Sequence, residues 1–381
     1  MTETPDIRKG LAGVVVDTTS ISKVNAETNS LLYRGYPVQE LAAKCTFEEV
    51  AYLLWHGELP TPKQLAEFET LERSLRHLQP VVKRVIDELP LTAHPMDVVR
   101  TAVSVIGASD PDAADSSPAS NLDKSIRLYA QLPAIVAYDQ RRRRGLHLVE
   151  PRDDLSYSAN FLFMTFDELP DVVVASAFDV SMILYAEHSF NASTFTARVV
   201  TSTLSDLYSA VVAGIGALKG ALHGGANEAV MHIFDEIGTA DKAEGWLDAA
   251  LAEKRKIMGF GHRVYKNFDP RAKLVKESAD EVLAELGVHD PLLDLAKELE
   301  EVALSDDYFK ERRLYPNVDF YTGVIYKAMG FPTRMFTPLF AIGRLPGWLA
   351  HWTEMQNDPQ TKIGRPQQLY IGSGERNYPG V

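Results

Sequence analysis

Two glycines after a histidine mark the stretch of this chain best suited to chemistry. His223 lies in Leu222-His223-Gly224-Gly225, just before a segment from Ala226 that favours a helix. Glycines let the backbone turn tightly and let a ligand approach it closely. A histidine at a helix N-terminus is favoured in its neutral form, so it can donate a hydrogen bond to a developing enolate. A helix-capping histidine beside two packing glycines is the structural alternative.

Three further polar residues stand in similar settings. His262 follows Gly259-Phe260-Gly261, where the backbone can again come close to a ligand, and His188 follows a strongly apolar segment. Asp319 lies in Pro316-Asn317-Val318-Asp319, which resembles the first turn of a helix running to Met329. A buried structural histidine and an aspartate that complements the helix dipole are the alternatives.

Three arginines each stand beside proline or glycine: Arg271, Arg344 and Arg365. Such neighbours suggest fixed guanidinium groups, which suit bidentate binding of carboxylates. Each arginine alone also fits an ordinary surface cation.

Composition limits the classes of protein that fit. The chain has 381 residues, a formal net charge of −13 and 45% hydrophobic residues. This acidity argues against a general nucleic-acid binder, which needs a basic surface. Cys45 is the one cysteine, and no signal peptide or membrane-spanning stretch is visible. We therefore expect a soluble cytoplasmic protein.

Several common chemistries lack their sequence signatures. There is no phosphate-binding Gly-x-x-x-x-Gly-Lys-Ser/Thr loop and no Gly-x-Ser-x-Gly elbow. The glycines at 214, 216 and 220 miss the dinucleotide-binding spacing, and the histidines give no zinc pattern. We expect neither a metal nor a bound cofactor.

The elements that must position these residues are mainly helical. Residues 10–17 form a short β-like run, and 32–37 add a turn, which predicts a small N-terminal sheet. Helical periodicity then predicts one helix from Val38 to Gly57 and another over 172–185. The last section runs from Pro316 through a glycine-punctuated helix to Trp352, and 358–381 predict a non-helical tail that wraps a surface. No alternating βαβ pattern occurs, so the sequence predicts an all-α fold.

At this point the sequence resembles the citrate synthase family, from Gly10 to the tail. Four motifs in order carry the resemblance: 184–194 (LYAEHSFNAST), 222–227 (LHGGAN), 259–265 (GFGHRVY) and 316–320 (PNVDF). It implies a two-domain helical fold with a small N-terminal β element. The large, dimer-forming domain would comprise 1–224 and 329–381, and the small domain, on the coenzyme A side, 225–328.

The resemblance also assigns roles. The family's catalytic trio falls on His223, His262 and Asp319. Oxaloacetate would be held by His188, Arg271 and Arg344, and by Arg365 from the neighbouring subunit of a homodimer. The coenzyme A loop falls on Arg255, Lys256, Ile257, Met258, Gly259 and Phe260. Coenzyme A enters as the thioester substrate, not as a cofactor.

The most specific prediction concerns the acyl group that the protein transfers. Residues 10–19, 94–100 and 185–194 look most like bacterial 2-methylcitrate synthases, which condense propionyl-CoA with oxaloacetate in propionate catabolism. Residues 261–266 and 315–319 fit citrate synthases of the tricarboxylic acid cycle, which use acetyl-CoA, equally well. We predict both condensations with propionyl-CoA preferred, and Phe320 and Tyr321 as candidate pocket walls or packing residues. Two rival interpretations are a non-catalytic helical interaction protein and a lyase running related chemistry in reverse.

Overall fold

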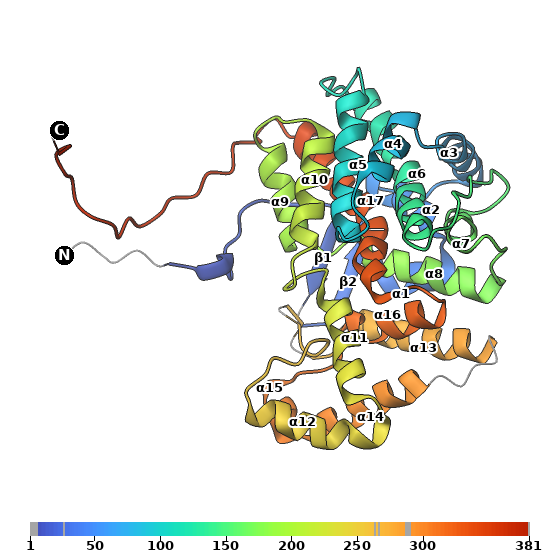
Figure 1. The fold of residues 1–381 in the computed structure, drawn as a ribbon. Helices are drawn as coiled ribbons and strands as arrows, with labels where there is room; N and C mark the ends of the chain where they lie inside the picture. Colours follow the sequence, from blue (N-terminus) through green and yellow to red (C-terminus); the bar gives the residue numbers. More distant parts are fainter. Residues whose placement is uncertain (1–6, 26, 263, 266, 286–290, 380–381) are drawn as a thin grey trace.

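A computed structural model describes residues 7–25, 27–262, 264–265, 267–285 and 291–379. Within these ranges the chain forms 17 α-helices and one small sheet, which confirms the expected helical fold (Figure 1). In Figure 1, helices α2–α7, α9, α10 and α17 form an upper lobe, and α12, α14 and α15 lie at the bottom of a lower lobe. None of the described helices is long and apolar enough to cross a membrane.

The sheet has three short antiparallel strands in the order β1-β2-β3: β1 (Ser22–Asn25), β2 (Ser30–Tyr33) and β3 (Tyr36–Pro37). It confirms the predicted turn over 32–37. The β-like run over 10–17 was wrong as a strand. Those residues are exposed, with one 3-10 turn (Lys9–Leu11), and make no strand pairing. A strand needs a neighbour to satisfy its backbone, and this segment lies beside none.

The single helix predicted from Val38 to Gly57 was also wrong, because the structure has two: α1 (Val38–Lys44) and α2 (Phe47–His56). The break falls at Thr46. Its side chain accepts a hydrogen bond from the Glu49 N–H, and the Glu49 carboxylate accepts one from the Thr46 N–H. This capping box starts a new helix despite continuous apolar periodicity.

Helices α3 to α10 complete most of the upper lobe. Their bounds are α3 (Pro62–Ser74), α4 (Pro80–Glu88), α5 (Pro95–Ser109), α6 (Pro118–Arg143), α7 (Tyr157–Phe166), α8 (Val172–Tyr185), α9 (Ala192–Thr201) and α10 (Leu207–Leu218). The helix expected over 172–185 is confirmed as α8.

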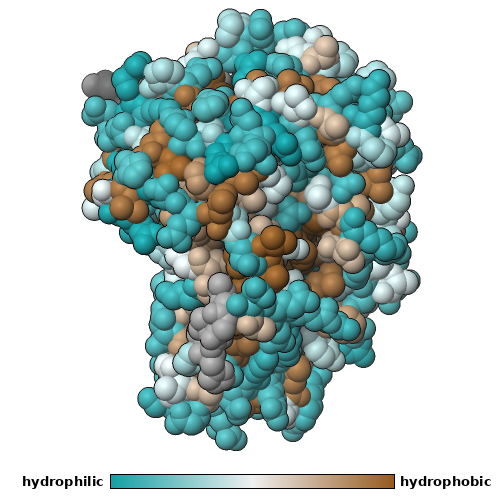
Figure 2. All heavy atoms as spheres, turned by 90° about the vertical axis from the view of Figure 1, so that its right-hand side faces the viewer, coloured by the Kyte–Doolittle hydropathy of each residue, from teal (hydrophilic) through white to brown (hydrophobic). Residues whose placement is uncertain are grey.

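The lower lobe holds α11 (Ala226–Ile237), α12 (Ala243–Ala252), α13 (Pro270–Glu285), α14 (Pro291–Ser305), α15 (Asp307–Arg312) and α16 (Val318–Ala328), with a 3-10 turn at Ala240–Lys242. Here α13 packs on α16 and also reaches up to α8 and α1. Figure 2 shows the surface narrowing between the lobes, with hydrophobic side chains gathered at that level.

The helix expected to begin around Asp319 and to run to Met329 is confirmed as α16, and a second helix completes the section to Trp352. The chain leaves α16 at Met329, passes a 3-10 turn (Thr333–Met335) and begins α17 (Phe336–Asn357). Every residue from Phe336 to Trp352 is buried, because α17 is packed against α2, α6, α8, α9 and α10. This helix carries Arg344 into the centre of the molecule.

The two terminal segments leave the body on the same side (Figure 1). Beyond Thr361 the described tail is exposed and contains no helix or strand, which confirms its predicted lack of helix. It extends away from this chain's own body, so within one chain it does not wrap a surface.

Candidate active site

His223 lies in the turn between α10 and α11, two residues before the N-cap Gly225. The turn is tight: a Cβ on Gly224 would stand 2.6 Å from the Leu218 carbonyl oxygen. The ring Nε2 accepts a hydrogen bond from the Ser193 backbone N–H (3.2 Å), at the N-terminus of α9, and contacts the Ser193 hydroxyl (2.8 Å). Because a backbone N–H only donates, Nε2 is unprotonated and the ring proton lies on Nδ1.

Burial, with the Arg344 charge nearby, lowers the pKa of His223 to about 3. At neutral pH the ring is therefore uncharged and holds one N–H free to donate. This is the electronic state that the sequence predicted.

His262 has the opposite tautomer. Its Nδ1 accepts hydrogen bonds from the N–H groups of Val264 (3.1 Å) and Tyr265 (3.2 Å), so the proton lies on Nε2. Burial and then the Arg271 charge lower the pKa of His262 to about 4. His262 is thus a second neutral donor.

Asp319 lies in the first turn of α16, where Asn317 caps the helix. Its Oδ1 accepts a hydrogen bond from the Tyr185 hydroxyl (3.2 Å), which also contacts Thr322 Oγ1 (2.8 Å). Burial raises the pKa of Asp319 to about 6, although Arg271 acts to lower it. A carboxylate with a raised pKa is a stronger base than one in water.

Hydrogen bonds join the turn before His262 to the segment before Asp319. The Gly261 N–H donates to the Tyr315 carbonyl (2.7 Å), and the Asn317 N–H donates to the Gly259 carbonyl (2.9 Å). The Asn317 side chain also donates to the Gly261 carbonyl (3.0 Å). The turn that carries His262 is therefore bonded to the start of the helix that carries Asp319.

Arg271 and Arg344 each bring a buried guanidinium group to the site, and they bond to different partners. Arg271 binds Asp269 through both Nε (3.0 Å) and Nη2 (2.8 Å), and Asp269 also accepts the Val318 N–H (3.2 Å). Burial would lower the pKa of Arg271, but the ion pair outweighs burial and keeps it raised.

Arg344 donates from Nε to the Tyr185 carbonyl (2.6 Å) and lies over the Phe340 ring at 5.0 Å. Its Nη1 is buried and has no hydrogen-bond partner among the residues that the structure describes. Burial lowers the pKa of this guanidinium. Leaving a charged donor unpaired in the interior is costly, so this nitrogen is suited to an anionic ligand.

His188 lies beyond α8 and is buried. Its Nε2 contacts the Tyr265 hydroxyl at 3.2 Å, and its ring centre lies 5.0 Å from that of His262. Burial, then the positive charge of Arg271, lowers the pKa of His188. The ring is neutral beside two cationic groups.

The remaining predicted residues lie apart. Arg365 is exposed on the tail after α17, and the N–H of the preceding Gly364 donates to the Ser202 hydroxyl at the end of α9 (2.9 Å). Arg255 and Lys256 are exposed, and Arg255 is ion-paired with Glu236 (2.7 Å). Ile257, Met258, Gly259 and Phe260 lead from these cations to His262, so the loop connects the surface with the site.

Phe320 and Tyr321 both contact other side chains of the lower lobe. Phe320 packs edge-on against Phe234 and Phe260, and the Tyr321 hydroxyl donates to Glu300. These contacts favour the packing interpretation of both residues over the pocket interpretation.

Sequence reasoning assigned no role to an aromatic pair that joins the two sides of the site. Tyr185 stacks on Phe340 (ring centres 3.9 Å apart), and Phe340 lies 6.1 Å from the His223 ring. Ser193 was missed as well, although Tyr185 and Ser193 both fall inside the 184–194 motif. Position in that motif, five or fewer residues from His188, was the available signal.

Two cavities of the structure lie elsewhere. One, of about 360 Å³, is bordered by the N-terminal segment and α17, and the other, of about 600 Å³, lies between α5 and α10. Across the described residues no three His, Cys, Asp or Glu side chains are grouped so as to hold a metal ion. The site is thus an arrangement of two neutral donors, one basic carboxylate and buried guanidinium groups.

The chain is similar to known proteins along nearly its whole length. The family model "Citrate synthase, C-terminal domain" matches residues 10–367. A citrate synthase of Mycolicibacterium smegmatis is 54% identical over 98% of both chains. A 2-methylcitrate synthase of Mycobacterium tuberculosis is 53% identical over 100% of this chain and 94% of its own.

Solved structures agree in fold. Citrate synthase from Pyrobaculum aerophilum superposes with a TM-score of 0.91 at 43% identity, covering 98% of this chain and 95% of its own. The citrate synthase of Thermoplasma acidophilum, solved with carboxymethyl coenzyme A and oxaloacetate, gives 0.93 at 33% identity over 99% of both chains. The chain belongs to the citrate synthase family and is an acyltransferase of that family.

Proposed function

We propose that the protein condenses an acyl-CoA thioester with oxaloacetate and water, and that propionyl-CoA is its preferred acyl donor, giving 2-methylcitrate and CoA. The observation that carries the reaction is the pairing of a neutral donor with a basic carboxylate. His223 and Asp319 stand on the two sides of the stacked Tyr185–Phe340 pair, beside the unpartnered Arg344 nitrogen.

In this reaction Asp319 removes a proton from the carbon next to the thioester carbonyl. His223 donates a hydrogen bond from Nδ1 to the carbonyl oxygen. Because the ring is already neutral, it stabilises the enol without first losing its own charge. The carbon then forms a bond to the keto carbon of oxaloacetate, while His262 gives a proton from Nε2 to the keto oxygen. Water hydrolyses the thioester and releases CoA.

Oxaloacetate carries two carboxylates and needs fixed cations to orient it. We assign this task to Arg344, Arg271 and His188, with Arg365 supplied by a second copy in a homodimer. The buried, unpartnered Arg344 Nη1 supports an anion at this place. The exposed Arg255 and Lys256, with residues 257–260, would bind coenzyme A.

We further propose two domains, 225–328 as the small one and 1–224 with 329–381 as the large one. The narrowing between the lobes in Figure 2 supports this division. Closure of the small domain would exclude water from the enol. The cytoplasm is the compartment we propose, with a role in propionate catabolism.

The acyl preference rests on the motifs over 10–19, 94–100 and 185–194. Identities of 54% to a citrate synthase and 53% to a 2-methylcitrate synthase favour neither substrate, so citrate synthase is the second candidate. The two acyl groups differ by one methylene, worth about 1–3 kcal/mol of discrimination. We expect both thioesters to react.

The deciding measurement is kcat/KM for propionyl-CoA and acetyl-CoA at saturating oxaloacetate. We expect propionyl-CoA to be favoured by roughly ten-fold or more. A preference for acetyl-CoA would instead establish a citrate synthase. Release of no CoA from either thioester would favour a non-catalytic protein.

A further inference from the structure

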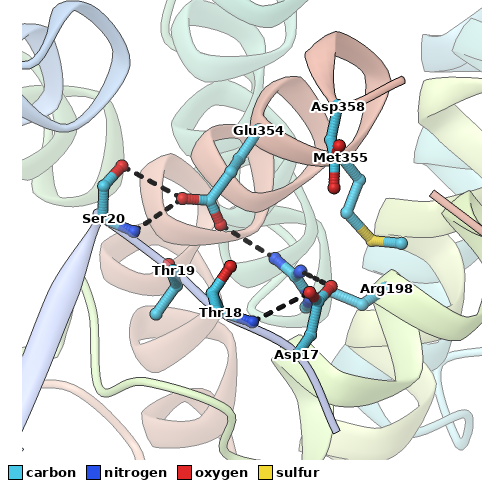
Figure 3. Close-up of a pocket in the computed structure, with 8 residues that line it drawn as sticks. All are labelled: Asp17, Thr18, Thr19, Ser20, Arg198, Glu354, Met355 and Asp358. Atoms are coloured by element: carbon cyan, nitrogen blue, oxygen red, sulfur yellow. Dashed lines mark hydrogen bonds and ion pairs between the residues drawn. The ribbon is translucent and has the colours of Figure 1, made fainter. Parts of the chain in front are cut away.

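The cavity of about 360 Å³ adjoins a network of hydrogen bonds that reaches the candidate active site. Figure 3 shows its outer end, where Arg198 of α9 points between Asp17 of the N-terminal segment and Glu354 of α17. Arg198 Nη2 lies 2.5 Å from Asp17 Oδ2, and Nη1 lies 3.0 Å from Glu354 Oε2. The Asp17 side chain is 38% exposed, whereas that of Arg198 is only 5% exposed.

From Arg198 the network continues inward through a histidine. Arg198 Nη1 donates to Nδ1 of His351 (3.0 Å), because a guanidinium cannot accept. His351 therefore donates from Nε2 to Glu187 Oε1 (3.1 Å). Both His351 and Glu187 are fully buried, and Glu187 directly precedes His188.

A second route leads from Asp17 to the same place along the chain. The Ser20 N–H and hydroxyl both donate to Glu354 Oε1, at 2.8 and 3.1 Å. Two residues later, the Ser22 hydroxyl donates to Glu187 Oε1 (3.0 Å) and accepts the Ser189 N–H (2.9 Å). Residues 17–22, which we call the strap, thus close a ring of contacts with Arg198, His351 and Glu187.

The turn over 187–190 has a backbone conformation that contacts with other residues must stabilise. Ser189 has a φ of +55°, a left-handed conformation that a non-glycine residue holds only when its surroundings fix it. Arg198 also lies 4.3 Å over the ring of Phe190, the next residue of the same turn. The turn over 187–190 is therefore held by the strap and by Arg198.

We propose that Ser22 and Asp17, acting through Arg198, His351 and Glu187, are positioning residues that set the place of His188 in the oxaloacetate site. Neither is catalytic, since neither reaches the predicted catalytic trio. The inference rests on the proposed function, in which His188 binds oxaloacetate. It predicts that damage to the strap weakens oxaloacetate binding and leaves acyl-CoA binding unchanged.

The test uses two mild variants with matched controls. Ser22→Ala removes the inner hydroxyl and is compared with Ser125→Ala, another buried serine whose hydroxyl bonds the Asn121 carbonyl within α6. Asp17→Asn neutralises the outer carboxylate. Its control is Asp154→Asn, which breaks an exposed pair with Arg152 on a distant loop.

Oxaloacetate affinity is measured by calorimetry without acyl-CoA, and KM is measured for both substrates. We expect Ser22→Ala to weaken oxaloacetate binding about 3- to 10-fold, the loss typical of one buried hydrogen bond. In Ser22→Ala and Asp17→Asn, KM for the thioester should stay near the wild-type value. Both control variants should keep the wild-type melting temperature. Because Asp17 is at the surface, its variant remains informative even if Ser22→Ala folds poorly.

The combined variant tests the ring itself. If both residues act through one network, the double variant loses less affinity than the product of the two single losses. Independent, multiplicative losses overturn the coupling. Wild-type binding of oxaloacetate with no change in either variant overturns the inference alone, whereas a wild-type protein that binds no oxaloacetate overturns the proposed function and this inference with it.

Discussion

Burial acts on the three residues of the predicted trio in one direction, toward the uncharged form. It lowers the pKa of His223 to about 3 and of His262 to about 4, and raises that of Asp319 to about 6. The two rings then stay neutral donors at any pH near neutrality. Asp319 remains mostly ionised at neutral pH, yet it is more basic than an exposed aspartate. Burial thus keeps both histidines neutral as hydrogen-bond donors and makes Asp319 a stronger base.

Replacing Asp319 with Asn should remove the base and keep the shape of the side chain. We expect kcat to fall about 10²- to 10⁴-fold, the usual contribution of general base catalysis, while oxaloacetate still binds. Steady-state turnover measures the fall in kcat, and calorimetric titration measures the binding of oxaloacetate. Near-normal turnover would exclude Asp319 as the base.

The pH dependence of the rate should report Asp319. Its carboxylate is the active form, so kcat/KM should be lost as pH falls below about 6, before either histidine becomes charged. The Tyr185 hydroxyl donates to this carboxylate and thereby lowers its pKa. In Tyr185→Phe the acid limb should move up by roughly 0.5 to 1 pH unit, the equivalent of one hydrogen bond. An unmoved limb would mean that another group controls the profile.

At the scale of elements, sequence patterns identified the helix over 172–185 but missed the division of the one predicted over 38–57. Apolar spacing continues across Cys45 and Thr46, so periodicity alone could not show the break that the Thr46–Glu49 capping box makes. The valines at 14–16 suit a strand, but pairing depends on neighbours far away in the chain. His223 and His262 were identified as candidates because glycine-rich turns mark them. Tyr185 and Phe340 were not, since stacking between α8 and α17 is a property of the packed fold.

Gly259 offers a test of how tightly the predicted coenzyme A loop is packed. Its φ is +87°, and an added Cβ would stand 2.7 Å from Val230 Cγ2 and 2.9 Å from Phe320 Cδ2. Gly259→Ala should lower the free energy of unfolding by about 2–4 kcal/mol, from backbone strain and overpacking together. It should also raise KM for the thioester.

Gly238 is the matched control, because its φ is +80° and no atom lies within 4 Å of the point where a Cβ would stand. Gly238→Ala carries only the backbone strain, about 1 kcal/mol. Denaturant unfolding compares the two variants. Equal losses would show that the Gly259 loop can relax around a side chain.

At the scale of the whole molecule, both terminal segments expose large apolar side chains. Val15 is 89% exposed on one segment, and Ile371 and Tyr378 are 90% and 84% exposed on the other. Both segments extend on the same side of the body (Figure 1). Burying such groups is favourable, so this arrangement supports the homodimer we propose. It also fits an Arg365 that serves the neighbouring chain.

Hybrid dimers test that exchange of Arg365 directly. An Arg365→Ala chain and a His223→Ala chain should each be nearly inactive as homodimers. In a hybrid, the body of the Arg365→Ala chain keeps His223 and receives an intact Arg365 from its partner, so one of its two sites is complete. Random reassortment of equal amounts should therefore restore activity to about one quarter of wild type, since half the dimers are hybrids with one good site. Differently tagged chains, purified as hybrids after refolding, allow the exchange to be verified before activity is measured. If verified hybrids stay inactive, Arg365 acts within its own chain or outside the chemistry altogether.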